Sequence, residues 1–132
     1  MEYFCYNFCM WEIDRTDEVK TWIEAQDDDA REVILEKLIV LKKLGPQLGR
    51  PTVDSVKGSS FNNMKELRIQ NKNRVFRIFF AFDPERKAIL LIGGDKKGIN
   101  DFYEKMIHQA DKLYSSHLEE LRRKKDDKKR KK

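Results

Sequence analysis

The sequence predicts a single α+β domain, in which a small antiparallel sheet carries helices mainly on one face. Two observations predict this class. Three apolar runs with strand character follow one another at 64–70, 74–82 and 87–93, joined by short links that favour antiparallel hairpins. Segments with helical apolar spacing lie on both sides of these runs, at 17–44 and from 102 onward. The expected order of elements is therefore β-α-α-β-β-β-α, in a chain of 132 residues that suits one modest core.

The first part of the chain predicts one strand and two helices. Residues 11–15 alternate between apolar and polar side chains, as a short strand does. Thr16 then suits a helix N-cap for residues 17–25, with two acidic residues in the first turn, where the helix dipole favours anions. A second helix opens at the aspartates 27–29 and stops at Gly45-Pro46.

A long loop and a three-stranded hairpin series follow. Residues 45–63 are rich in Gly, Pro, Ser and Asn and are typical of a surface loop. Between the second and third strands of the series, Pro84 suits the second position of a turn. Asn100 and Asp101 cap the last helix, whose apolar positions are Phe102, Met106, Ile107, Ala110, Leu113, Leu118 and Leu121.

The charge is concentrated at the C-terminal end. The full chain has a net charge of +5, yet residues 122–132 alone contain nine basic and two acidic side chains. This segment is of low complexity, and we expect it to be a disordered tail or a fraying helix end. It is either an ordinary solvated terminus or an element that attracts RNA non-specifically.

Composition also excludes several classes. The start has no basic region followed by an apolar stretch, as a secretory signal would, and no apolar run is long enough to span a membrane. The only cysteines, Cys5 and Cys9, stand far from both histidines and make no zinc set. We therefore expect a cytoplasmic protein without metal, cofactor or membrane partner.

One arginine stands inside the most apolar strand. Alternation places Phe76, Ile78 and Phe80 on the core face of the strand and Arg77 on the opposite, partly open face. The same rule puts Arg68 of the preceding strand on the face of Arg77. With Lys96 and Lys97 after the next strand, the two guanidiniums would make a phosphate site. The alternative is a structural ion pair of Arg77 with Asp95, Glu66 or a helix carboxylate.

Several segments together resemble the RelE/HigB superfamily of bacterial toxins, in particular its small phage-derived HigB-like members. The resemblance covers about residues 10–115. It is carried by WEIDRTDEVKTWI, LGPQLGRP, MKELRI, RVFRIFFAF and ILLIGGDKKG, in this order and spacing. It implies a toxin domain over residues 10–121 that starts near Met10, with residues 1–9 as an N-terminal extension and residues 122–132 as the basic tail.

The resemblance implies a ribosome-dependent, metal-independent mRNA endoribonuclease, in which the ribose 2′-oxygen attacks the adjacent phosphorus. Arg77 matches the arginine that stabilises the phosphate, and Lys97 matches the basic residue after the last strand. Tyr103 matches the tyrosine that opens the final helix, for proton transfer or for stacking on a base. The residues expected to bind RNA phosphates are Arg68, Arg74, Lys96 and Lys65.

The chain also departs from the family pattern. Met64 stands where related enzymes carry a lysine, which leaves Lys65 as the nearest ammonium group, and residues 64–104 contain no histidine. The resemblance therefore assigns no general base.

The expected partners follow from the same resemblance. They are the ribosome with its mRNA and a cognate HigA-like, helix-turn-helix antitoxin. Two other functions stay open: a ParE-like inhibitor of DNA gyrase, and a catalytically silent module of the same fold that binds RNA or protein.

Overall fold

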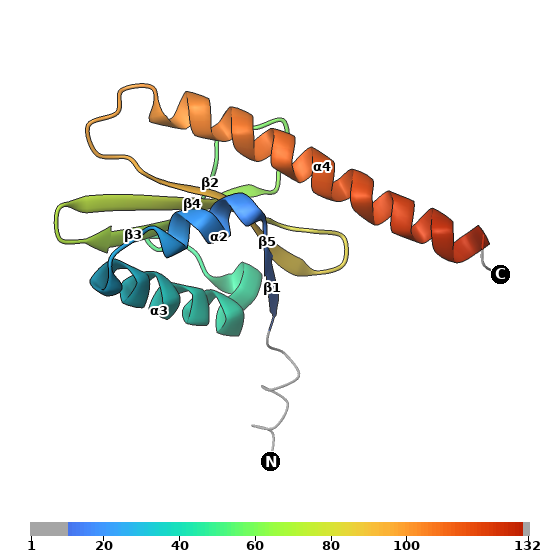
Figure 1. Ribbon diagram of the computed structural model, residues 1–132, viewed down its shortest axis with the longest axis horizontal. Coiled ribbons are helices and arrows are strands. Elements are labelled where there is room, and N and C mark those ends of the chain that lie inside the picture. Colours follow the sequence, from blue (N-terminus) through green and yellow to red (C-terminus); the bar gives the residue numbers. More distant parts are fainter. Residues whose placement is uncertain (1–10, 131–132) are drawn as a thin grey trace, which may run out of the picture.

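The computed structural model describes residues 11–130, so the N-terminal extension predicted over residues 1–9 lies outside the described part. Within that part, one five-stranded sheet is combined with three α-helices (Figure 1). The elements are β1 (Glu12–Arg15), α2 (Asp17–Glu24), α3 (Asp28–Leu44), the 3-10 turn η1 (Gly45–Gln47), β2 (Val53–Ser55), β3 (Met64–Asn71), β4 (Arg74–Phe82), β5 (Lys87–Asp95) and α4 (Phe102–Arg130).

The sheet has the strand order β1-β5-β4-β3-β2. Strands β2 to β5 pair in antiparallel fashion, and β1 pairs with β5 in parallel, so the sheet is mixed where the sequence predicted an antiparallel one. The α+β class is confirmed. One strand was not predicted, because β2 lies inside the segment expected to be a loop. Val53 of β2 pairs with Leu67 of β3 and is buried. A strand of three residues is too short to show alternation in the sequence.

Side-chain caps start the two helices of the first half where the sequence predicts them. The Thr16 hydroxyl accepts the backbone N–H of Val19 at 3.1 Å, and the Asp27 carboxylate accepts that of Ala30 at 2.9 Å. Each cap satisfies a backbone donor that the first helical turn leaves free. Gly45 ends α3 with a φ of +55°, in the left-handed region that favours glycine.

The turn between β4 and β5 is held by an aspartate. The Asp83 carboxylate accepts the backbone N–H groups of Glu85 and Lys87, each at 2.9 Å, and Pro84 stands between as predicted. The other oxygen of the same carboxylate lies 2.8 Å from Nε2 of His117 in α4. The turn is thereby attached to the last helix.

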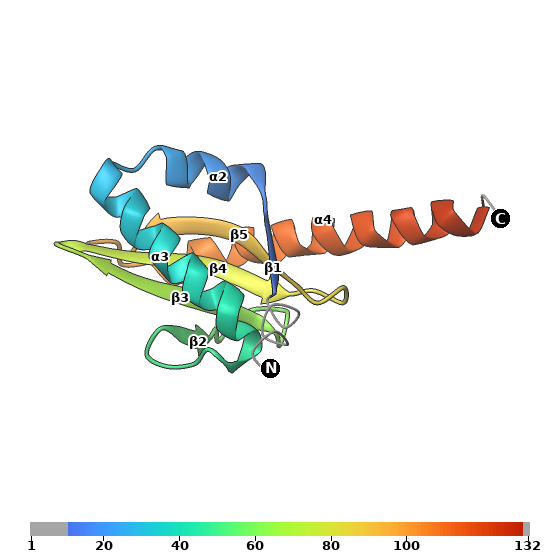
Figure 2. The same cartoon turned by 90° about the horizontal axis from the view of Figure 1, so that it is seen from below.

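The two faces of the sheet carry separate cores (Figures 1 and 2). Helices α2 and α3 cover one face, as the prediction of helices mainly on one face requires, while α4 lies on the other. The first core includes Phe76, Ile78, Phe80, Leu67, Ile34 and Leu41. The second includes Phe79, Leu91, Met64, Phe102, Ala110 and Tyr114. The face of Arg77, expected to be partly open, is thus partly covered by α4.

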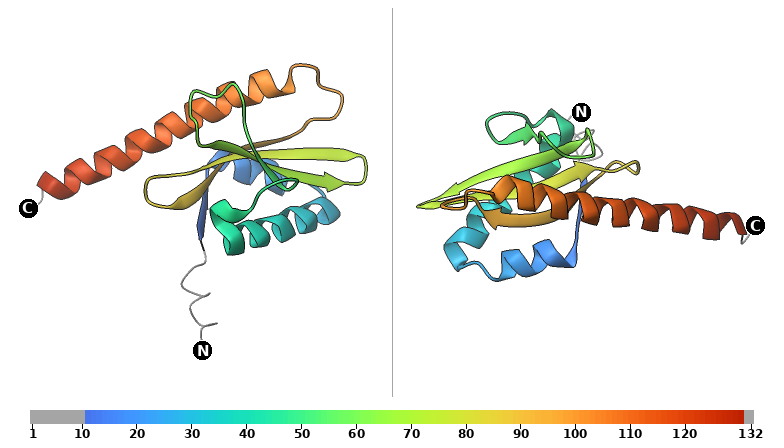
Figure 3. Two further views of the ribbon diagram at one scale, coloured as in Figure 1. Left: turned by 180° about the vertical axis from the view of Figure 1, so that it is seen from behind. Right: turned by 90° about the horizontal axis from the view of Figure 1, so that it is seen from above.

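Helix α4 continues through the basic segment to Arg130, where the sequence analysis left a disordered tail and a fraying helix end as alternatives, so the described residues are helical here. The physical reason is that residues 102–130 contain neither glycine nor proline, and lysine and arginine are good helix formers that also suit a helix C-terminus. Figure 3 shows this end of α4 projecting well past the sheet. No helix within residues 11–130 is long and apolar enough to cross a membrane.

Candidate active site

Arg77 is held near the middle of β4, on the face that α4 covers. The register of the sheet pairs it directly with Arg68 of β3, so both guanidiniums project on the same face, as alternation predicts. The Arg77 side chain is only 11% exposed. Its Nη1 donates to the backbone carbonyl of Phe76 at 2.9 Å, and its Nε donates to the Tyr103 hydroxyl at 3.2 Å. A ligand can therefore reach only one edge of this guanidinium.

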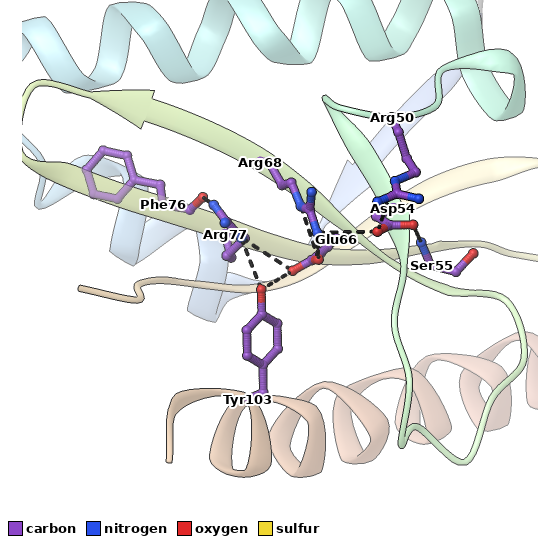
Figure 4. A network of polar contacts seen from close by, with 8 residues as sticks. All are labelled: Arg50, Asp54, Ser55, Glu66, Arg68, Phe76, Arg77 and Tyr103. Atoms are coloured by element: carbon purple, nitrogen blue, oxygen red, sulfur yellow. Dashed lines mark hydrogen bonds and ion pairs between the residues drawn. The ribbon is translucent and has the colours of Figure 1, made fainter. Parts of the chain in front are cut away.

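A buried carboxylate, Glu66, joins the two arginines (Figure 4). Its Oε1 lies 3.4 Å from Nε of Arg77, and its Oε2 accepts from Arg68 at 3.1 and 3.3 Å. The Glu66 side chain is 5% exposed, and burial of a charge at this depth requires such partners. This is the structural ion pair that the sequence analysis named as the alternative for Arg77. Asp95 instead accepts the backbone N–H groups of Val75 and Lys97.

Tyr103, in the first turn of α4, completes the contact. Its hydroxyl donates to Oε1 of Glu66 at 2.7 Å. Burial raises the pKa of the Tyr103 phenol, and the hydrogen bond to Glu66 raises this pKa further, while Arg77 opposes the effect. The phenol therefore keeps its proton at neutral pH. The ring packs edge-on against Phe79 and Phe102, so Tyr103 also belongs to the second core.

The network extends outward through Asp54 of β2. Its carboxylate accepts from Nη2 of Arg68 at 3.3 Å and lies 3.6 Å from Nε of Arg50 (Figure 4). Three guanidiniums, of Arg50, Arg68 and Arg77, thus face two carboxylates, and one positive charge is left over. Because the Arg68 side chain is 33% exposed, this excess is accessible to an anion from solvent.

A groove adjoins the network on the side of Tyr103. It has a volume of about 790 Å³ and lies between the loop that precedes β3 and helix α4. The Asp111 carboxylate holds this loop to α4, because it accepts from the Ser59 hydroxyl and from the backbone N–H of Ser60. The groove is lined by side chains that can contact a polyanion or a base, namely Lys57, Ser60, Tyr103, Lys105 and His108, and also by three carboxylates, Asp101, Glu104 and Asp111.

Two predicted phosphate ligands lie away from this network. Arg74 projects toward α3, where Nη2 lies 2.7 Å from Asp27, the N-cap of that helix. Lys65 shares its side of β3 with Leu67 and Ile69 of the first core, opposite Glu66 and Arg68. The expectation that Arg74 and Lys65 join Arg77 is therefore not met, because strand alternation directs both to the other face.

The two lysines after β5 are placed differently from each other. The ammonium of Lys96 lies 5.4 Å from the centre of the Tyr103 ring, within reach of a cation–π interaction. Lys97 is exposed, and its backbone N–H donates to Asp95 at 3.1 Å. Among the described contacts, Lys96 is thus the lysine that touches the Arg77–Glu66–Tyr103 group, although Lys97 was the predicted catalytic counterpart.

Sequence reasoning named Glu66 only as one possible ion-pair partner of Arg77 and did not name Asp54. Alternation places Glu66 on the side of β3 that carries Arg68, as the structure shows. The sequence did not indicate Asp54, because the segment that forms β2 was predicted to be a loop. Together, a carboxylate, a phenol and two guanidiniums in hydrogen-bond contact can exchange protons and hold an anion.

Comparison with known proteins places this chain in a family. The family described as "Phage derived protein Gp49-like (DUF891)" matches residues 21–115. A Mycobacterium tuberculosis (strain ATCC 25618 / H37Rv) protein described as "Putative toxin HigB2" is 40% identical over 110 residues, which are 82% of this chain and 54% of that protein. A second protein of that strain, "Putative toxin HigB3", is 49% identical over 81 residues, which are 61% of this chain and 69% of its own length.

This chain therefore spans about half the length of the first relative and about two thirds of the second. The family match covers most of the chain and agrees with the resemblance in strand and loop motifs. The chain belongs to the phage-derived Gp49-like family, as a HigB-like member of the RelE/HigB toxin superfamily.

Proposed function

We propose that the chain is the toxin of a type II toxin–antitoxin pair and acts as a metal-independent endoribonuclease on mRNA bound to the ribosome. The observation that carries this proposal is the convergence of Arg77, Glu66 and Tyr103 from β4, β3 and α4, with contacts of 2.7 to 3.4 Å. The chemistry needs a base, an acid and cations that stabilise a crowded phosphorus, and this group contains all three.

Glu66 takes the role of general base, which the sequence resemblance left unassigned. In the proposed step its carboxylate accepts the proton of the ribose 2′-hydroxyl while the 2′-oxygen attacks the adjacent phosphorus. The bond between phosphorus and the 5′-oxygen breaks, which leaves a 2′,3′-cyclic phosphate and a free 5′-hydroxyl. A carboxylate held by two guanidiniums is oriented for this task before the substrate arrives.

Tyr103 takes the role of general acid. Because its pKa is raised, the phenol carries its proton at neutral pH and can give it to the leaving 5′-oxygen. Glu66, protonated in the same step, lies 2.7 Å from the phenolic oxygen and can return the proton there. The hydrogen bond between the two residues thus restores both groups to their starting states.

The cations stabilise the transition state. Arg77 offers the accessible edge of its guanidinium, Arg68 offers its exposed portion, and Lys96 adds a charge beside Tyr103. Their attraction is strongest when negative charge accumulates on the phosphorane oxygens. The incoming phosphate competes with Glu66 for the same guanidiniums, so binding of the substrate also loosens the carboxylate for proton transfer.

Partners and location follow from this proposal. The relatives carry toxin names, and a toxin requires a cognate antitoxin, for which we propose a HigA-like helix-turn-helix protein. A toxin that acts on ribosomes works in the cytoplasm. The short gene next to that of this chain should accordingly encode the antitoxin.

The catalytically silent module is the second candidate, and one observation favours it. Glu66 already neutralises Arg77, as it would in a purely structural ion pair. Expression of the chain in bacteria, followed by mapping of mRNA 5′ ends, separates the two. The endoribonuclease proposal predicts growth arrest with new ends at discrete codon positions. If the bacteria grow normally and the mRNA 5′ ends are unchanged although folded protein is expressed, the endoribonuclease proposal is wrong and the catalytically silent module is favoured.

A further inference from the structure

We propose that the far end of α4, residues 122–129, binds the phosphate backbone of double-helical RNA through one lysine-bearing face. These residues are called the arm below. The arm is separate from the Arg77–Glu66–Tyr103 group, and this inference concerns binding alone. Only the choice of RNA over DNA rests on the proposed function.

The arm has no role in the folded core. Leu118 is the last residue of α4 that packs against the second core. Leu121, Arg122 and Lys125 then line a small groove together with Pro84 and Glu85 of the β4–β5 turn. All side chains from 122 to 129 are exposed, and Figure 3 shows the helix continuing away from the sheet. Apart from Arg122 and Lys125 at this groove, the surface of the arm is therefore free for a partner.

The charges of the arm are segregated by side. At about 100° per residue, Lys124, Lys125, Lys128 and Lys129 fall within an arc of about 140° on the helix. The acidic residues of the same stretch, Glu119, Glu120, Asp126 and Asp127, fall on the opposite arc, of about 120°. Arg123 falls within the acidic arc, so that side carries both signs, whereas the lysine arc carries positive charge alone.

One carboxylate of the acidic side, Glu119, is already paired within the helix. Arg122 donates to both oxygens of Glu119, at 2.7 and 2.8 Å, and Nε of Arg123 lies 3.9 Å from the same carboxylate. The hydrogen bond from Arg122 lowers the pKa of Glu119, so this carboxylate stays ionised. Among residues 11–130, the ion pairs of the arm all lie on this side. The four lysines remain as a face of uncompensated positive charge.

The density of that face fits a nucleic-acid duplex. Lys124 and Lys129 are separated by about 7.5 Å along the axis, so four charges occur at about one per 2 Å. A duplex carries about one phosphate per 1.7 Å of its axis. The arm lacks any apolar side chain, which an interfacial membrane helix would need. Contacts with phosphates alone would give binding without sequence preference and with strong salt dependence.

An exchange of two neighbouring residues tests the face at constant composition. Lys125→Asp with Asp126→Lys places an acid in the middle of the lysine face and leaves the net charge unchanged. Arg123→Asp with Asp127→Arg is the matched control, because it exchanges a base and an acid within the acidic side. Circular dichroism of both full-length variants verifies that helix content is retained.

Affinity for a blunt RNA duplex is measured by fluorescence anisotropy between about 50 and about 200 mM salt. The Lys125/Asp126 exchange should weaken binding about tenfold at the low-salt end and reduce the slope of log affinity against log salt by about 1, while the control stays within about twofold of the unaltered chain. Equal affinity of both exchanges would overturn the lysine face. Tighter binding to a DNA duplex of the same sequence, or to vesicles rich in anionic lipid, would overturn the assignment to RNA.

The Arg77→Ala variant separates this inference from the proposed nuclease. It should bind the duplex as the unaltered chain does, because Arg77 lies in the sheet and not on the arm. Loss of duplex binding in this variant would place the contact at the active site and contradict the arm. Loss of mRNA cleavage with intact duplex binding, in contrast, bears on the nuclease alone.

Discussion

The Tyr103 hydroxyl donates a hydrogen bond of 2.7 Å to the Glu66 carboxylate, which connects the first turn of α4 to the middle of β3. Arg77 touches both residues, so three side chains from three elements form one polar group between the sheet and a helix. The proposed reaction depends on proton exchange within this contact.

Replacement of Glu66 by Gln should reduce cleavage on the ribosome by about 10² to 10⁴, because an amide cannot take a proton from the 2′-hydroxyl. The amide oxygen can still accept from Arg77, so the fold should persist, although a buried guanidinium without its carboxylate lowers the free energy of unfolding. Cleavage is followed under single-turnover conditions, beside a thermal melt. A folded variant that retains full activity would remove Glu66 from the mechanism.

Replacement of Tyr103 by Phe should lower the cleavage rate about 10²-fold while costing only about 1 kcal/mol of stability. The ring contacts with Phe79 and Phe102 are kept, and only the hydroxyl is lost. The rate of cleavage and the urea midpoint are measured together. An unaltered rate would assign Tyr103 to the core alone.

The pH dependence of stability should also differ between Tyr103→Phe and the unaltered chain. Burial and the bond to Glu66 raise the pKa of the Tyr103 phenol, so the folded state binds this proton more tightly than the unfolded state. That contribution to the free energy of unfolding is complete below about pH 10 and is lost as the pH rises through the raised pKa. The unaltered chain should therefore lose stability more steeply above pH 10 than Tyr103→Phe does. Parallel urea-midpoint curves would contradict the raised pKa.

Replacement of Lys96 should slow cleavage more than replacement of Lys97. The ammonium of Lys96 lies 5.4 Å from the Tyr103 ring centre, whereas Lys97 is exposed. Lys96→Ala should therefore slow cleavage about tenfold or more, and Lys97→Ala should have the smaller effect. Both single-turnover rates are compared at one ionic strength. A larger effect at Lys97 would restore the assignment made from the sequence resemblance.

Gly93 supports the sheet on the other face, against α2. A Cβ atom added there would lie 2.5 Å from the Trp22 ring, closer than side chains pack. Gly93→Ala should therefore lower the free energy of unfolding by about 1–3 kcal/mol. Gly49→Ala is the matched control, since nothing lies within 4 Å of its added atom. Equal melting temperatures of the two variants would show that Trp22 can move aside.

Much of the fold was predictable because it depends on local patterns. The limits of β4 and the caps Thr16 and Asp27 agree with the sequence, and alternation correctly placed Arg68 and Arg77 on one face. The position of α4 over that face was not predictable, since an amphipathic helix does not reveal which side of a sheet it covers. This placement brings Tyr103 to Glu66.

The site was predictable only where a periodic pattern fixed the direction of a side chain. Lys65 was included as the ammonium nearest to the lysine of the family pattern and Arg74 as a further phosphate ligand, but strand alternation turns both toward the α3 face. Asp54 was not predicted, because a strand of three residues is too short to show an alternating pattern in the sequence. Lys96 and Lys97 are neighbours beyond the end of β5, where no periodicity decides which of them faces Tyr103.

The proposed role of Arg77 in cleavage is tested most directly by single-turnover cleavage of ribosome-bound mRNA with Arg77→Ala and its matched control Arg74→Ala. Arg74 lies in the same strand, yet it pairs with Asp27 on the opposite face. We predict that Arg77→Ala remains folded and loses cleavage about 10²-fold or more, while Arg74→Ala cleaves at the rate of the unaltered chain. Equal rates for the two folded variants would contradict a role of Arg77 in cleavage.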